Sequence, residues 1–411
     1  MGTNNQKNDQ NIIPNDADKQ QKGVNVPNLR FSEFNNIYLA STLEQITKKV
    51  DRKASEQCNI PVMMISCGNG FILQSEKYSK DNAGQSLQKY TLLKKGELAY
   101  NHGASKTKPF GVCYVLKERD EALVPFVYHC FAITNGIPKY WNYSLNTEQM
   151  DHQLKRIVSS GARMDGLLNI SYQTYMLVKV YVPTNNEQQK IADFLSLIDN
   201  RIDTQNKIIE DLELFKKGIE NQYFGYHKNN EYVILGDIIT QVNNKNEQNK
   251  DFEVLSVSNK YGFIPQSEQF DDHEVASANK SNYKIVKQND FAYNPARINV
   301  GSIAMLKNNQ VGIVSPMYIC FRTDNNRILS SYLDYFSHSN KFNNAVLKNL
   351  EGSVRLCLSF ESLSKIKIHL PSLDTQYEIV KNLDLISNKI SIENKILEKL
   401  KEQKKYLLSN M

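Results

Sequence analysis

Two arginines hold equivalent places just past glycine-containing turns in the two halves of this chain. Arg163 closes the sequence Gly161-Ala-Arg, and Arg355 closes the sequence Gly352-Ser-Val-Arg. A guanidinium group presents a planar fork of N–H donors that fits a phosphate or the edge of a guanine base. An arginine paired with a carboxylate for structural reasons is the alternative. The chemistry of these two positions is the binding of an anion.

Two further loops carry donors suited to the same chemistry. One loop reads Asn-His-Gly-Ala-Ser-Lys-Thr-Lys from Asn101 to Lys108, and a solvated turn is its alternative. The other runs from Asn294 to Gly301 and adds an arginine and an amide, and an amide can bind an adenine edge through two hydrogen bonds. The candidate polyanion-binding residues are His102, Lys106, Lys108, Arg163, Asn294, Arg297, Asn299 and Arg355.

No motif for making or breaking bonds survives inspection. The tetrad Asn294-Pro-Ala-Arg is like the Asn/Asp-Pro-Pro-aromatic tetrad of amino-methyltransferases but lacks the second proline and the aromatic. The segment Cys67–Phe71 has two glycines without the third glycine and helix of a nucleotide loop, and GxxxxGK[ST] is absent from the sequence. Six cysteines contain no CxxC pair, and seven histidines are scattered, so we predict neither a metal site nor catalysis.

The elements that must position these loops begin with a stretch that occurs nearly twice. Pro183–Gln222 recurs from Pro371, and in both copies apolar residues step by four and three, the spacing of a long helix in a coiled coil. Gln205 and Glu393 interrupt the apolar stripe at equivalent places, which favours two helices that pair with each other, antiparallel as a two-fold repeat requires. The residues expected between the helices are Ile191, Leu195, Ile198, Ile202, Ile209, Leu212, Ile379, Leu383, Ile386, Ile390, Leu397 and Leu400.

The segments before the two helices also repeat each other. Gly70–Glu76 corresponds to Gly262–Glu268, and Ala99–Asn101 corresponds to Ala292–Asn294, while the intervening loops differ. Alternating apolar residues around glycine turns predict short strands, and the run 124–133 predicts one buried strand. A shared framework with unlike loops is typical of two modules that read two different ligands.

The repeat, the composition and the charge bound the architecture. The chain has 411 residues, and its net charge of +6 with a pI near 8.7 suits a nucleic-acid partner without requiring one. The sequence lacks a secretory signal and an apolar run of membrane-spanning length, so we expect a cytoplasmic protein without a membrane partner. The predicted parts are a disordered leader at 1–26, a domain at 27–183, a helix at 184–222, a linker at 223–231, a domain at 232–370 and a helix at 371–411.

The doubled pattern Pro-x-x-x-x-Gln-x-x-Ile followed by a long helix resembles the specificity subunit of type I restriction-modification enzymes. The segments Val26–Phe34, Tyr293–Ile298 and Leu358–Leu363 are also similar to members of this family, and the resemblance covers about residues 27–411. One departure is Thr375-Gln-Tyr in place of Glu187-Gln-Gln, which bears on the cap of the second helix.

The resemblance implies an α+β protein in which two tandem α/β target-recognition domains alternate with two long helices that pair as an antiparallel coiled coil. Each domain would read one half of a bipartite double-stranded DNA target, and the helices would set the spacing and dock two methyltransferase subunits. The chain itself would be non-catalytic and hold no cofactor. S-adenosylmethionine, ATP and Mg would belong to the methyltransferase and restriction subunits. The alternatives are a self-contained adenine DNA methyltransferase or nuclease, and a coiled-coil scaffold that does not bind DNA.

Overall fold

The computed structural model describes residues 26–53, 60–77, 84–103, 105, 108–158, 168–225, 232–269, 279–308, 311–352 and 356–411. These residues form two compact units. One unit comprises Met1–Asp203 with Glu398–Met411, and the other comprises Thr204–Leu397. Each unit therefore contains one globular domain together with one end of each long helix.

The two long helices are α6 (Asn185–Phe224) and α11 (Leu373–Asn410). Thr184 and Ser372 cap them, because the Thr184 hydroxyl accepts from the Glu187 N–H and the Ser372 hydroxyl accepts from the Thr375 N–H. The helix predicted to end at 222 continues to Phe224, and the cap of the second helix persists despite the departure at Thr375.

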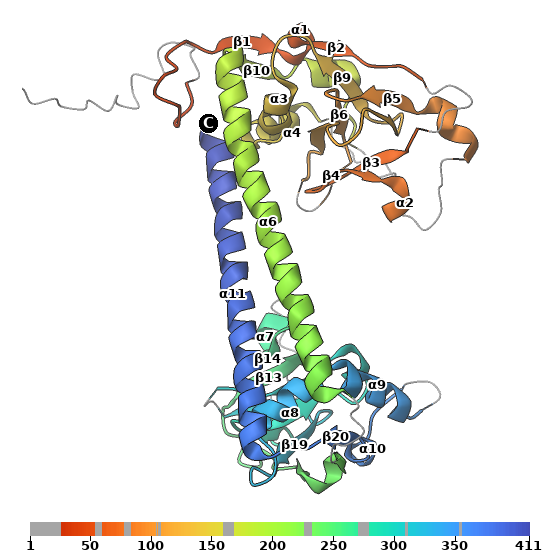
Figure 1. The fold of residues 1–411 in the computed structure, drawn as a ribbon, viewed down its shortest axis with the longest axis vertical. Helices are drawn as coiled ribbons and strands as arrows, with labels where there is room; N and C mark the ends of the chain where they lie inside the picture. The colour runs from red at the N-terminus through yellow and green to blue at the C-terminus, as the bar shows by residue number, and fades with distance from the viewer. Residues whose placement is uncertain are drawn as a thin grey trace, which may run out of the picture. The chain divides into compact units, whose positions relative to one another are not determined.

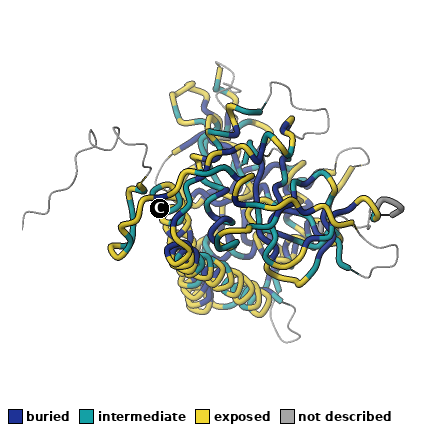
Figure 2. The backbone as a smooth tube through the Cα atoms, turned by 90° about the horizontal axis from the view of Figure 1, so that it is seen from above, coloured by how far each residue is buried: buried dark blue, intermediate teal, exposed yellow. Residues whose placement is uncertain are grey.

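The two helices lie side by side and run antiparallel (Figure 1). In the second unit, Asn382 near the start of α11 donates a hydrogen bond to Tyr223 at the end of α6. In the first unit, Lys404 near the end of α11 pairs with Asp199 in the first half of α6. In Figure 2, buried residues gather inside the globular parts, and the helices expose residues along their outer side.

The described residues of the first unit's globular domain form four small sheets with short helices beside them. One sheet has four strands in the order β2-β9-β6-β7, and the pairs β1-β10, β3-β4 and β5-β8 complete the set. Its elements are β1 (Leu39–Thr42), α1 (Leu43–Ile46), β2 (Thr47–Lys49), β3 (Met63–Ser66), β4 (Gly70–Leu73), α2 (Gln74–Lys77), η1 (Gly84–Lys89), β5 (Thr91–Lys94), β6 (Leu98–Asn101), β7 (Val112–Val115), β8 (Glu121–Val124), β9 (His129–Ile133), α3 (Pro138–Ser144), α4 (Glu148–Ile157), α5 (Tyr172–Met176) and β10 (Lys179–Val182).

The globular domain of the second unit repeats this plan. Its four-stranded sheet β12-β19-β16-β17 has the order of β2-β9-β6-β7, and β11-β20 matches β1-β10. A second sheet, β14-β13-β18-β15, joins the counterparts of β3-β4 and β5-β8. Its elements are β11 (Tyr232–Ile234), η2 (Leu235–Asp237), β12 (Ile239–Val242), β13 (Glu253–Ser258), β14 (Gly262–Pro265), α7 (Gln266–Gln269), β15 (Lys284–Val286), β16 (Phe291–Tyr293), η3 (Ile298–Val300), β17 (Ile303–Met305), β18 (Gly312–Val314), β19 (Ile319–Thr323), α8 (Ser330–Ser337), α9 (Asn340–Asn349), α10 (Phe360–Ser364) and β20 (Lys367–His369).

The predicted fold class is confirmed by this repeated plan, but one strand prediction is wrong. The run 124–133 is divided into β8 and β9 by a turn, in which the Tyr128 N–H donates to the Pro125 carbonyl. Proline has no N–H to donate to a ladder, so it ends the first strand. No described helix combines the length and the apolar composition needed to cross a membrane.

Candidate nucleic-acid interface

The loop after β16 in the second unit presents two of the predicted residues to solvent. The buried Asn294 side chain accepts a hydrogen bond from the Ala296 N–H at 3.0 Å, and the Arg297 N–H donates to the Asn294 carbonyl. This turn leads into η3, and both Arg297 at its N-cap and Asn299 within it are exposed. Gly301 closes the loop at a φ of 89°, a conformation that favours glycine. The loop therefore holds Arg297 and Asn299 outward on a rigid turn.

Asn294 itself does not belong to this exposed group. It is 7% exposed, and its side-chain oxygen is occupied by the turn. Asparagine is favoured at such turns because its side chain imitates a backbone hydrogen bond. The prediction that Asn294 contacts the ligand is therefore corrected to a structural role.

The turn between β13 and β14 lies beside this loop and adds two residues that the sequence analysis did not select. A Cβ built on Gly301 would lie 3.5 Å from the Asn259 Cβ, so the two turns are neighbours. The Tyr261 side chain is 68% exposed, and the Lys260 ammonium lies 5.0 Å from the centre of its ring. An exposed aromatic with a cation beside it suits stacking on a base next to a phosphate. The sequence signal that could have identified them is Lys260 followed by Tyr261 directly before the turn residue Gly262.

The base of the loop that carries Arg355 is anchored next to the same site. Glu351 and Cys357 exchange both backbone hydrogen bonds, and the Leu358 N–H donates to the Pro295 carbonyl at 3.0 Å. The Tyr293 hydroxyl also donates to the Leu358 carbonyl at 3.2 Å. The structure thus brings two of the predicted loops together, although Arg355 lies outside the described residues.

The first unit repeats this arrangement around Asn101 and His102. The Asn101 side chain accepts a hydrogen bond from the Gly103 N–H at 2.9 Å. The Asn294 side chain accepts in the same way from the N–H of Ala296, which is also two residues further along the chain. The Leu168 N–H donates to the His102 carbonyl at 2.9 Å, so Leu168, which follows the predicted loop of Arg163 in sequence, lies beside this turn. Arg163 and Lys106 lie outside the described residues.

His102 is part of the anchor and not of the surface. Its side chain is 5% exposed, and its Nδ1 and Nε2 lie 2.9 and 2.8 Å from the carbonyl oxygens of Leu168 and Val127. A buried polar ring needs such partners, and these leave its nitrogens no capacity for a ligand. The prediction that His102 contacts a polyanion is therefore corrected.

A second histidine supports the same anchor. His129 stacks on His102 with ring centres 4.9 Å apart, and its Nε2 lies 3.1 Å from the Ile170 carbonyl. Burial, and then the neighbouring His102 and Lys49 charges, lower the pKa of His129 to about 4 against the opposing bond to Ile170. His129 is therefore neutral at physiological pH, and its Nε2–H can donate to the carbonyl.

Lys108 is only partly available. Its ammonium donates to the Asn146 carbonyl at 3.1 Å and lies 3.8 Å from Asp151, with 30% of the side chain exposed. The lysine therefore holds its loop against the start of α4 while keeping part of its charge at the surface.

Comparison with known proteins agrees with these paired loops and helices. Residues 227–402 match a family described as the type I restriction modification DNA specificity domain. This match lies in the second half of the chain. The MjaVIII specificity subunit of a type I restriction enzyme from Methanocaldococcus jannaschii is 24% identical over 304 residues, 66% of this chain and 68% of that protein. The putative MjaX specificity subunit from the same organism is 26% identical over 262 residues, 56% of this chain and 58% of that protein.

Solved structures share the fold. The S subunit of a type I restriction-modification system from M. genitalium aligns with a TM-score of 0.54 and 16% identity, over 93% of this chain and 98% of that one. A chain from a study of complex assembly and conformational transition in the type I R-M system aligns with a TM-score of 0.57 and 13% identity, over 90% and 96%. The predicted resemblance to type I specificity subunits is confirmed.

The glutamine that the sequence motif repeats holds each long helix to the globular domain that precedes it. The Gln188 side chain accepts from the Ile137 N–H and donates to the Pro183 carbonyl, both at 2.9 Å. Gln376 accepts from the Leu329 N–H and donates to the Arg327 and Pro371 carbonyls. Both glutamines are fully buried. The sequence repeat identifies Gln188 and Gln376 as equivalent residues. Their role in joining each helix to its globular domain follows only from these hydrogen bonds.

The twelve predicted helix-pair residues are all buried or half-buried, but they fall into two groups. Ile191 and Leu195 belong to the core of the first globular domain, and Ile379 and Leu383 belong to the core of the second. The first turns of each helix are thus domain core, and the contact between helices begins further along. The remaining members are Ile198, Ile202, Ile209, Leu212, Ile386, Ile390, Leu397 and Leu400.

Proposed function

We propose that this chain is the DNA-binding specificity subunit of a type I restriction-modification complex, and that each unit reads one half of a bipartite double-stranded target. The observation that carries the proposal is the repeated anchoring of two loops. In one unit the loops meet at His102 and Leu168, and in the other they meet at Pro295 and Leu358. The frameworks are alike and the exposed side chains differ, as two readers of unlike half-sites require.

The exposed groups of the second unit suit both parts of DNA recognition. Arg297 can bind a guanine edge through two hydrogen bonds, and Asn299 can do the same with adenine. Lys260 suits a phosphate, and Tyr261 suits stacking or an apolar contact. Arg355, Arg163 and Lys106 stay predictions for the same interfaces.

The paired helices would set the distance between the half-sites and dock two methyltransferase subunits. Gln205 and Glu393 are equivalent in the repeat and contact each other at 2.5 Å, which supports the pairing of the two helices. Because the two helices have the same design, they would offer similar docking surfaces to two copies of one partner.

In this proposal the chain contributes binding and no chemistry. Methyl transfer from S-adenosylmethionine to adenine would occur on the methyltransferase subunits. ATP-driven translocation and Mg-dependent cleavage would belong to restriction subunits. The complex would act on DNA in the cytoplasm, without a membrane partner.

A gel shift and a methylation assay test the proposal together. Methylome sequencing of the source strain supplies the bipartite motif, and duplexes with the motif and with either half scrambled are the probes. We expect the chain with its methyltransferase to bind and methylate only the intact motif, and the purified chain alone to transfer no methyl group. Methyl transfer by the isolated chain would favour a self-contained methyltransferase. DNA cleavage by the isolated chain would favour a nuclease, and binding of the methyltransferase without binding of DNA would favour a scaffold.

A further inference from the structure

Two equivalent turns carry apolar side chains at their tips, the turn 125–128 between β8 and β9 and the turn 315–318 between β18 and β19. The first reads Pro-Phe-Val-Tyr and the second reads Ser-Pro-Met-Tyr. Phe126, the second residue of its turn, is 56% exposed, and Met317, the third residue of its turn, is 59% exposed. Turn tips are usually occupied by glycine, proline and small polar residues. A large exposed apolar residue in both turns indicates a role outside the core.

The same hydrogen bonds hold both turns in place. The N–H of the closing tyrosine, Tyr128 or Tyr318, donates to the carbonyl of the first turn residue at 3.0 Å. The hydroxyl of the same tyrosine accepts from a backbone N–H of the neighbouring strand, that of Ile65 in β3 at 3.2 Å and that of Val257 in β13 at 3.3 Å. The exposed tips therefore stand on a fixed backbone.

Each turn lies beside the candidate interface of its own unit. In the first unit, the His102 Nε2 lies 2.8 Å from the Val127 carbonyl oxygen, so the turn contacts the candidate loop directly. In the second unit, the Val257 N–H donates to Tyr318, and the Val257 carbonyl accepts at 3.2 Å from Ser302, which directly follows the candidate loop. The turn and the loop thus meet at one strand residue. The apolar tips therefore adjoin the polar groups that suit DNA reading.

Lysines flank both turns. Backbone pairing forms a row directly before each turn, made of Lys53, Thr91 and Val124 in the first unit and of Lys245, Lys284 and Val314 in the second. Lys53 and Lys245 occupy equivalent places and are exposed. The Lys284 ammonium donates to the Tyr318 carbonyl at 2.7 Å, so its charge lies at the turn itself. Ammonium groups beside an apolar tip match the phosphates that flank a base step.

The features that the two turns share suit a role common to both half-sites. The candidate loops differ between the units and carry groups for base edges, whereas the turns keep one geometry and one apolar character. Side chains of phenylalanine and methionine have no strong donor or acceptor for a base edge. Both residue types serve as wedges that enter between neighbouring base pairs and kink the duplex. Deformation of the duplex therefore fits these turns better than recognition of a particular base.

We propose that Phe126 and Met317 are wedges that enter a base step beside the half-site of their own unit, an inference that rests on the proposed function. The flanking lysines pair with the phosphates of that step. Unstacking is cheapest at flexible pyrimidine–purine steps, so the wedges favour such steps. A base must leave the stack before it is methylated, and a wedge that has already parted a neighbouring step makes this movement easier.

The test removes one wedge at a time and leaves the candidate loops untouched. Phe126→Ala and Met317→Ala are the two variants, and Leu39→Ala is the matched control, because Leu39 is an exposed apolar residue in β1. The chain with its methyltransferase subunit is bound to duplexes that carry the motif and a dye pair across one half-site or the other. Energy transfer then measures bending, and titration measures affinity.

We expect the wild type to bend the duplex at both half-sites. Each wedge variant should lose the bend at one half-site, a different one for each variant. Each should bind the motif roughly tenfold more weakly, the loss of one stacked contact, with single-base preferences unchanged. The Leu39→Ala variant should match the wild type in bending and affinity.

Three results would overturn the inference while leaving the proposed function intact. One is a duplex that stays straight although the wild-type complex binds and methylates it. Another is wild-type bending and affinity in both wedge variants. The third is a variant that loses preference for one thymine, with the same loss in the wild type when uracil replaces that thymine, since the side chain then reads the thymine methyl group. If the wild-type complex does not bind the motif at all, the proposed function fails and the wedges fail with it.

Discussion

The two units hold their helices in the same way and present different chemistry at their loops. In both units, a buried glutamine in the first turn of the long helix forms hydrogen bonds with the globular domain. A tyrosine of a short helix also donates to an aspartate of a long helix at 2.6 Å, Tyr143 to Asp199 in the first unit and Tyr335 to Asp384 in the second. At the loops, the first unit has the turn 67–70, reading Cys-Gly-Asn-Gly, where the second has 259–262, reading Asn-Lys-Tyr-Gly.

The difference teaches where a repeat is constrained. The groups that both units share form hydrogen bonds with backbone donors and with carboxylates. Removing one of these groups leaves its partner unpaired, which costs about 1 to 3 kcal/mol of stability where that partner is buried. The groups that differ are mostly solvated, so their replacement costs the fold little. Substitutions in the loops therefore change stability little, and they can alter which ligand the loops bind.

The largest expected effect concerns a buried ion pair of the first unit, at a position where the second unit has an uncharged residue. Glu187 is fully buried and accepts from Arg30 at 2.7 and 2.8 Å and from the Tyr38 hydroxyl at 2.8 Å. The repeat places Thr375 at its position in the second unit. We expect Glu187→Ala to destabilise the first unit by roughly 3 kcal/mol, because it leaves the Arg30 charge and the Tyr38 hydroxyl without their acceptor.

Urea denaturation with hydrogen exchange resolves this change by unit. Thr375→Ala is the matched control, and its effect should stay within about 0.5 kcal/mol, since Thr375 is exposed. Equal losses from both substitutions would show that the buried pair adds nothing special to the first unit.

The next effect concerns DNA recognition by the second unit alone. Arg297→Ala should reduce discrimination at one position of one half-site by about 1 to 3 kcal/mol if the guanidinium contacts a base edge. If it contacts a phosphate, all sequences should weaken alike and the salt slope should fall by about one. Competition gel shifts with single-base variants of both half-sites separate the two outcomes. Unchanged binding to every variant would remove Arg297 from the interface.

A smaller effect distinguishes the units by pH. The pKa of His129 is about 4 in the folded chain against its ordinary 6.5, so the unfolded chain takes up the proton first as pH falls. Stability from the neutral ring is thus fully present above about 6.5 and is lost as pH falls towards 4. Because the ring is half-buried, we expect a loss of about 1 to 2 kcal/mol over this window.

The control for this pH effect comes from the repeat. Ile319 stands at the position of His129 in the second unit, so His129→Ile makes the first unit resemble the second there. Urea denaturation from pH 7 to pH 4 should show a flatter pH dependence in the variant. An unchanged slope would mean that another group carries the titration.

The last effect is measured in base pairs and tests what the two repeats share. Four residues inserted after Gln205 and four after Glu393 lengthen both helices by about 6 Å near their equivalent contact. We expect the preferred spacer of the DNA target to grow by one or two base pairs with both half-sites unchanged. Methylation of a library with varied spacers measures it. A changed base preference at constant spacing would place the helices in the reading surface.

The helices and the repeat could be predicted from the sequence because their causes are local. Apolar residues stepping by four and three define one face of a helix wherever it lies, and Thr184 and Ser372 act on backbone groups within their own turn. A second copy of the same pattern then predicts a partner helix of the same design. The division of the run 124–133 into two strands also has a local cause, the proline at 125. The sequence analysis predicts one strand there because it gives more weight to the apolar residues around Pro125.

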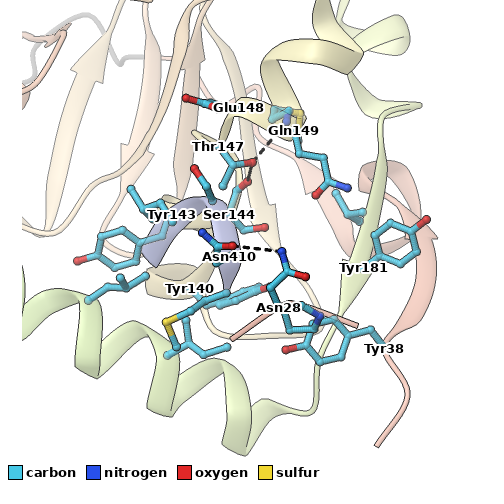
Figure 3. Close-up of a pocket in the computed structure, with 18 of the residues that line it drawn as sticks. Asn28, Tyr38, Tyr140, Tyr143, Ser144, Thr147, Glu148, Gln149, Tyr181 and Asn410 are labelled. Carbon is cyan, nitrogen blue, oxygen red and sulfur yellow. Dashed lines mark hydrogen bonds between the residues drawn. The ribbon is translucent and has the colours of Figure 1, made fainter. Parts of the chain in front are cut away.

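The tertiary structure alone decided the roles of the polar residues. His102 and Gln188 look solvated in the sequence, and their burial follows from carbonyls and an N–H supplied by residues far away in the chain. The same holds for a cavity of about 430 Å³ beside α3 (Figure 3), because the residues that line it, such as Asn28, Tyr140 and Asn410, come from segments distant in sequence. Periodicity reports which face of an element is buried, but the partner of a polar group depends on which distant backbone the fold brings to it.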